Sequence, residues 1–173
     1  MMSVPQRQQG TADVAPLRLT LKLVAPTTGY VDGGWWPYSR DLGAEVVDLA
    51  PAVALRLGPI REVAYPLDAW DAAPHRVGID PAGEGRSVRL VGFASQDPDV
   101  VLVTGESERT LGLLVVPPES PDPAGHDAMN RAARAGNAES PTALLAAAGV
   151  PQAVRIPGRR RPPASLPRRR RAR

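Results

Sequence analysis

Three aspartates in predicted loops are the residues of this sequence that could carry acid–base chemistry. Asp32 precedes a pair of tryptophans, Asp68 lies two residues before Trp70, and Asp97 begins an Asp-Pro dipeptide. Two carboxylates can serve as general acid and as base or nucleophile when their surroundings drive their pKa values apart. Aspartate is also a common turn and capping residue, and structural roles explain most of these positions. A small hydrolase is therefore kept as an alternative hypothesis, with no catalytic residue assigned.

A second group of candidates is aromatic. Four of the seven aromatic side chains fall within residues 30–38, in a loop that also contains several glycines. An exposed indole can stack on a sugar, a base or a proline ring. The competing interpretation is that the loop folds over one end of the core, with one of the two adjacent tryptophans buried and the other wet. If the loops converge at one end of the sheet, they predict a surface for a protein or small ligand, made of Tyr30, Trp35, Trp36, Arg40, Trp70 and Gln96.

The C-terminal segment concentrates positive charge. Residues 155–173 contain nine arginines and no acidic residue, which leaves 12 basic and 18 acidic side chains, a net charge of −6, in residues 1–154. Guanidinium groups bind phosphates through paired hydrogen bonds, so the segment predicts nucleic acid or another polyanion as a partner. A compositional bias of the chain, which has 20 arginines and one lysine, is the competing explanation. The expected contact residues are Arg159, Arg160, Arg161, Arg168, Arg169, Arg170 and Arg171.

Composition argues against several other chemistries. The absence of cysteine removes disulfides, thiolate nucleophiles and zinc sites built on sulfur. Imidazole is available only from His75 and His126, and Lys22 is the only lysine, so neither a multi-histidine metal site nor a lysine-ended phosphate loop is expected. We expect no metal and no cofactor. The polar start and the lack of a long apolar run predict a cytoplasmic protein without membrane insertion.

Hydrophobic periodicity predicts the elements that position these residues. Leucine occupies every second position of 17–23, as in a strand with one buried face. Helical spacing from residue 42 onward predicts two short helices at 40–49 and 51–57, because Pro51 lacks an amide proton and crowds the preceding turn. Period-two patterns with short linkers predict further strands at 61–67, 75–79, 87–93, 99–104 and 110–116.

Two capping signals follow the predicted sheet. Asp122-Pro123 and Ser140-Pro141 each place a capping side chain before a proline at the first helical position. They predict two short, alanine-rich helices near the C-terminus. The fold class expected from the whole pattern is α+β, with a mostly antiparallel, meandering sheet of five to six strands and one broken helix after the first strand.

The expected domain organisation is one globular unit with disordered ends. Periodicity is lost before residue 16 and after residue 148, and the charge of the arginine-rich end prevents it from burying a core. We therefore expect a single α+β domain at 16–148, best defined at 17–118, between a disordered arm at 1–15 and a disordered Arg/Pro-rich tail at 149–173.

The aromatic loop also carries a resemblance to a known family. The string Gly-Tyr-Val-Asp-Gly-Gly-Trp-Trp-Pro at 29–37, with shorter strings at 39–42, 67–70, 95–98 and 113–118, resembles an uncharacterised family of small actinobacterial proteins over roughly residues 17–135. That family is classed only as a domain of unknown function, so the resemblance implies no activity, cofactor or catalytic residue. The arginine-rich end is not a feature that we associate with it.

The combined prediction is a non-catalytic, cytoplasmic binding module. Its contacts are expected at the aromatic loop and at the polyanion-binding tail, since the usual catalytic constellations are absent from the sequence. The alternatives are a small hydrolase that uses the loop carboxylates, and a nonspecific nucleic-acid-associated protein that acts through the arginine tail.

Overall fold

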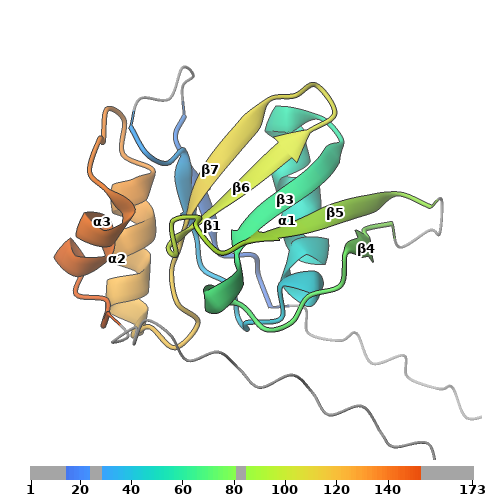
Figure 1. The fold of residues 1–173 in the computed structure, drawn as a ribbon. Coiled ribbons are helices and arrows are strands. Elements are labelled where there is room, and N and C mark those ends of the chain that lie inside the picture. The colour runs from blue at the N-terminus through green and yellow to red at the C-terminus, as the bar shows by residue number, and fades with distance from the viewer. Residues whose placement is uncertain (1–14, 24–28, 81–84, 153–173) are drawn as a thin grey trace, which may run out of the picture.

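A mixed β-sheet with helices on both faces forms the described part of the computed structural model, residues 15–23, 29–80 and 85–152 (Figure 1). The predicted α+β class is confirmed. The strand order is β1-β2-β7-β6-β3-β5-β4. The elements in chain order are β1 (Leu19–Leu21), β2 (Gly33–Trp35), α1 (Leu42–Leu57), β3 (Ile60–Pro66), the short 3-10 helix η1 (Leu67–Ala69), β4 (Arg76–Gly78), β5 (Ser87–Phe93), β6 (Val100–Gly105), β7 (Thr110–Val115), α2 (Asp122–Ala132) and α3 (Pro141–Ala147).

The sheet differs from the predicted meander in strand number and in two of its pairings. Seven strands are present in the described residues, and β2 pairs with β7, and β3 with β5, in parallel. The additional strand, β2, lies inside the segment expected to be a loop. Its Gly-Gly-Trp sequence shows no alternation, and glycine is a poor strand former. Glycine is needed here because a β-carbon on Gly34 would lie 2.7 Å from the Met129 backbone.

α1 is one continuous helix, so the prediction of a helix broken at Pro51 is wrong. Pro51 lies on the exposed side of the helix, where water can bind the carbonyl group left without a partner. The helix begins at Leu42, two residues later than predicted, and the side chain of Asp41 caps it by accepting a hydrogen bond from the Ala44 amide. Burying a large apolar side chain contributes about 1.5–3 kcal/mol. The buried side chains of α1 together outweigh the cost of a proline inside the helix. The buried positions are Leu42, Gly43, Val46, Leu49, Ala50, Val53 and Leu57.

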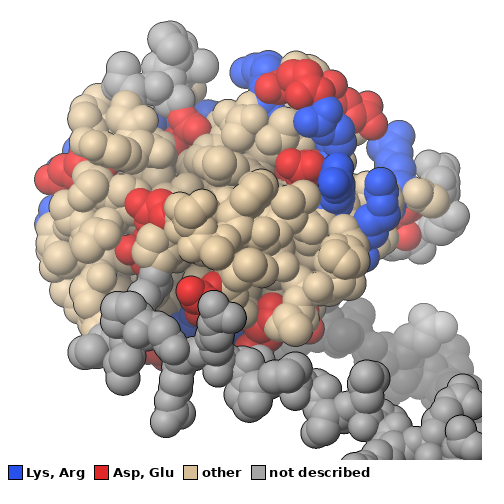
Figure 2. Space-filling model, viewed as in Figure 1, with Lys and Arg blue, Asp and Glu red and all other residues tan. Residues whose placement is uncertain are grey.

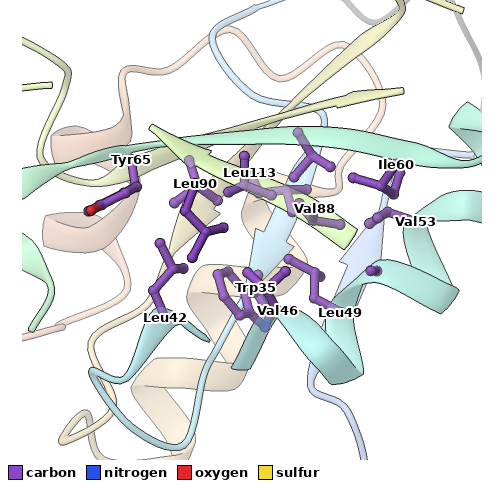
Figure 3. Close-up of a cluster of buried hydrophobic side chains, with 14 of the residues drawn as sticks. Trp35, Leu42, Val46, Leu49, Val53, Ile60, Tyr65, Val88, Leu90 and Leu113 are labelled. Atoms are coloured by element: carbon purple, nitrogen blue, oxygen red, sulfur yellow. The ribbon is translucent and has the colours of Figure 1, made fainter. Parts of the chain in front are cut away.

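Side chains of the sheet alternate between two hydrophobic clusters. Figure 3 shows the cluster beneath α1, where Trp35 and Leu113 of the sheet lie against the helix. On the opposite face, Trp36 and Leu114 pack beneath α2 and α3. Because successive residues of a strand point to opposite faces, the two adjacent tryptophans enter different clusters.

The two C-terminal helices form where the capping signals place them. Ser140 caps α3 through a hydrogen bond from the Ala143 amide, as predicted, while α2 begins one residue early, after Pro121. Asp127 pairs with Arg131 one turn later on α2, and this hydrogen bond raises the pKa of the Arg131 guanidinium. No helix in the described ranges is both long and apolar enough to cross a membrane.

The packed region extends slightly past its predicted limit. Val150, which we assigned to the tail, is buried beside the residues of α3, and its amide donates to the Leu145 carbonyl. Residues 1–14 of the predicted arm and residues 153–173 of the predicted tail lie outside the described residues.

Candidate functional site

The three tryptophans of the predicted aromatic surface are buried. Trp35 is 0% exposed, Trp36 1% and Trp70 8%. The rings of Trp35 and Trp70 stack with centroids 5.5 Å apart, and the Trp36 indole donates a hydrogen bond to the Pro117 carbonyl at 3.1 Å. The expectation that an exposed indole binds a ligand is therefore wrong. Helices cover both faces of the sheet at β2, so neither of the adjacent tryptophans can point into water.

The tyrosines of the same loop remain at the surface. Tyr30 is 66% exposed, whereas Tyr38 packs against a cation. The guanidinium carbon of Arg18 lies 3.7 Å from the Trp36 ring centroid and 3.9 Å from that of Tyr38. Arg18 also donates to the carbonyls of Trp36 and Pro37, at 3.0 and 2.8 Å. These contacts fix the aromatic loop to the start of β1. Arg18 therefore stabilises the fold.

Arg40 and Gln96, the polar members of the predicted surface, also hold backbone segments together. Arg40 donates to the Ala69 carbonyl at 2.8 Å and pairs with Glu119 at 2.5 Å. It thereby joins the loop after β2 to η1 and to the segment after β7. The amide nitrogen of Gln96 donates to carbonyls at 3.1 and 2.8 Å, in β3 and β6. The polar groups of both side chains are therefore used within the fold, Arg40 between loop segments and Gln96 on two strands.

The three candidate carboxylates have separate surroundings. Asp32 accepts a hydrogen bond from the Gly112 amide at 2.7 Å, and Asp97 accepts one from the Asp99 amide at 2.9 Å. Asp68 lies exposed in η1. No hydrogen bond joins any two of them, and the described ranges hold no group of three side chains arranged to bind a metal ion.

One half of a sheet face is uncovered in the described structure. α2 and α3 cover β1, β2 and the adjoining ends of β7 and β6, while the rest of this face is open toward the viewer in Figures 1 and 2. Strand register groups its outward side chains into three rows that run across the strands. The first row is polar and contains Thr110, Thr104, Glu62, Arg89 and Arg76; the second is apolar and contains Gly112, Leu102, Ala64 and Val91; the third contains Pro66 and Phe93.

The polar row ends in a groove lined by three arginines. The cavity has a volume of about 470 Å³ and lies over β3, β4 and β5, at the end where charged side chains gather in Figure 2. Arg76 is the register partner of Arg89 in the antiparallel β4–β5 pair. Like charges directly opposite each other destabilise such a pair. The groove is lined by Ile60, Arg61, Glu62, Arg76, Ser87, Arg89 and Glu106.

The arginines of the groove are only weakly neutralised. Arg61 pairs with Glu108 in the exposed β6–β7 hairpin, and Arg89 lies 3.8 Å from Glu62. Exposed ion pairs of this kind contribute about 0–1 kcal/mol, so a ligand anion can replace them at little cost. Arg76 hydrogen-bonds the Ser87 hydroxyl at 3.3 Å and contacts no carboxylate among the described residues. The guanidinium and hydroxyl groups of the groove can therefore donate hydrogen bonds to one anion.

Sequence reasoning missed this groove. Its arginines are separated along the chain and belong to three strands, β3, β4 and β5. The available signal was the position of Arg89 between the buried Val88 and Leu90 of a period-two segment; Arg61 lies at a register shift between Ile60 and Glu62, which the pattern does not show. Only the strand order and register bring them together, and neither could be derived from spacing.

The fold and the groove define a small α+β protein with one open, arginine-edged sheet face. The model of a family of unknown function, DUF5994, matches residues 18–132, and the chain belongs to this family. The expected membership of a family of unknown function is thereby confirmed. The match spans β1 to the end of α2, so it includes the whole groove. No curated protein and no solved structure matches the chain.

Proposed function

We propose that the protein is a non-catalytic, cytoplasmic binding module that holds an anionic partner in the arginine groove. The observation that carries the proposal is the pairing of Arg76 with Arg89 at the wall of a cavity of about 470 Å³. Sheet stability alone disfavours two cations in register. An anion between them removes the repulsion and accepts hydrogen bonds from both guanidinium groups.

The surroundings of the candidate carboxylates support a non-catalytic role. Asp32 and Asp97 each accept a backbone hydrogen bond that fixes the path of a loop. A hydrolase of the type considered above needs two carboxyl groups that face one substrate. No contact of the described residues points to such a pair, so the hydrolase stays the weaker hypothesis.

The arginine-rich segment, residues 155–173, extends the proposal outside the described residues. Its nine arginines would add attraction to the same polyanion without sequence preference. In this view the groove determines where the anion binds, and the segment raises the encounter rate and the salt dependence.

Isothermal titration calorimetry of the full chain with inorganic polyphosphate tests the proposal. Arg76→Gln and Arg89→Gln each remove one charged hydrogen-bond donor from the groove and should weaken binding about tenfold. Arg134→Gln is the matched control, because Arg134 is exposed after α2 and does not line the groove. Equal affinities for the groove variants and for the control would reject the groove as the binding site.

A further inference from the structure

We infer that the anionic partner is a single-stranded nucleic acid that lies across the open sheet face. Its phosphates would contact the arginines of the polar row, and its bases would contact the exposed apolar side chains of the face, Leu102 and Phe93. The inference rests on the proposed function, since it names the partner of the same groove. It assigns nucleic-acid contact to the sheet itself and does not depend on the arginine-rich segment.

Phe93 provides the stacking surface. It is 46% exposed and lies on the same side of β5 as Arg89 and Val91, because residues two apart in a strand share a face. Phe93 lies four positions after Arg89, which places their Cα atoms about 13 Å apart at the usual rise of a strand. Exposed aromatic rings on open sheets stack unpaired bases, and such stacking tolerates any sequence. Neighbouring nucleotides of one strand can thus reach both the ring and the guanidinium group.

The row between Phe93 and the arginines is apolar. Leu102, Ala64 and Val91 are neighbours in register there, and none of them carries a charge. A single strand has one charged edge and one largely apolar edge, which matches a face with arginines on one side and apolar side chains on the other. A fully inorganic polyanion would leave the apolar rows unused. A double helix keeps its bases stacked inside and could not present them to Phe93.

Anisotropy titrations of the full chain with four labelled or competing probes test the inference. The probes are a single strand of about 12 nucleotides, as DNA and as RNA, an abasic strand of equal length, and inorganic polyphosphate. The base-bearing strands should bind at least about fivefold more tightly than the abasic strand, the gain expected for one stacked base. Phe93→Leu should abolish that difference and leave polyphosphate binding unchanged.

A matched variant separates Phe93 from the other exposed aromatic residues. Tyr30→Leu removes a ring that is more exposed than Phe93 but lies in the aromatic loop, and it should leave all affinities unchanged. If Tyr30→Leu, and not Phe93→Leu, removes the preference for bases, the strand binds at the aromatic loop and the inference is wrong.

Failure of the inference is distinguishable from failure of the proposed function. If base-bearing and abasic strands bind equally while Arg76→Gln weakens both, the groove binds anions but the sheet does not contact bases. If a glutamate-rich peptide binds more tightly than any strand at the same ionic strength, the partner is an acidic protein and the inference is overturned. If the groove variants change no affinity at all, both the inference and the proposed function fail.

Discussion

Gly125 of α2 lies against the ring of Trp36 so closely that a β-carbon at this position would come within 2.6 Å of two ring atoms. The helix can therefore approach β2 only because this residue has no side chain. Together with Gly34, which faces the Met129 backbone across the same interface, it sets the position of α2 on the sheet. The place where α2 and α3 end determines which half of this face stays open.

Gly125→Ala should destabilise the protein through this contact. The ring of Trp36 is buried and cannot move aside, so the added methyl group should cost about 1–3 kcal/mol of unfolding free energy. Urea denaturation measures the change. Gly78→Ala is the control, since a β-carbon there meets open space and the variant should unfold at nearly the same urea concentration. Equal stability of the two variants would contradict the packing described for α2.

Arg18→Ala should loosen the aromatic loop. The substitution removes a cation held between two aromatic rings and two hydrogen bonds to backbone carbonyls, a loss of about 1–3 kcal/mol. Arg18→Lys should recover only part of it, because an ammonium group cannot reproduce the planar fork of donors. Thermal unfolding of both variants, with Arg134→Ala as the control, measures the order of their stabilities. An Arg18→Ala protein as stable as Arg134→Ala would show that the loop does not depend on this side chain.

Pro51→Ala should stabilise the protein. Alanine restores the amide that Pro51 lacks in the middle of α1, and the exposed position requires no repacking, so a gain of about 1–3 kcal/mol is expected. Pro59→Ala, outside the helix, should bring no such gain. Both are measured by urea denaturation. A destabilised Pro51→Ala protein would mean that the pyrrolidine ring of Pro51 makes a contact worth more than the restored helical hydrogen bond.

Glu62→Gln should raise the affinity of the groove for polyanions. Glu62 lies 3.8 Å from Arg89 and competes with a bound anion for it. Removing its charge should strengthen polyphosphate binding roughly threefold, since an ion pair of this exposure is worth under about 1 kcal/mol. Glu139→Gln, remote from the lining of the groove, is the control. A loss of affinity on Glu62→Gln would instead make this carboxylate part of the ligand's binding site.

Local patterns predicted much of the fold. The alternating leucines gave a strand at β1, and residues 87–93 form β5 within the predicted bounds. Both succeed because side-chain alternation is a property of neighbouring residues. β2 was missed because its glycines are selected by contacts with α2 and β1, which are distant in sequence. The unbroken α1 was missed because burial of its inner face overrides the local preference of Pro51.

The candidate site could not be predicted from the sequence for a related reason. The Trp-Trp pair was visible as an unusual string, but its burial depends on helices that cover both faces of the sheet at β2. The arginines of the groove were individually unremarkable, and they become neighbours through a parallel β3–β5 pairing and an antiparallel β4–β5 pairing. Long-range register, rather than residue type, creates the site.

The salt dependence of single-strand binding by the full chain measures whether the arginine groove holds phosphates. Each phosphate neutralised on a single strand contributes about 0.7 to the slope of the logarithm of the affinity against that of the salt concentration. If the groove binds phosphates, Arg76→Gln and Arg89→Gln together should reduce the slope by about 1.4. An unchanged slope, with Arg134→Gln as the reference, would place the phosphates elsewhere and contradict the assignment of the groove.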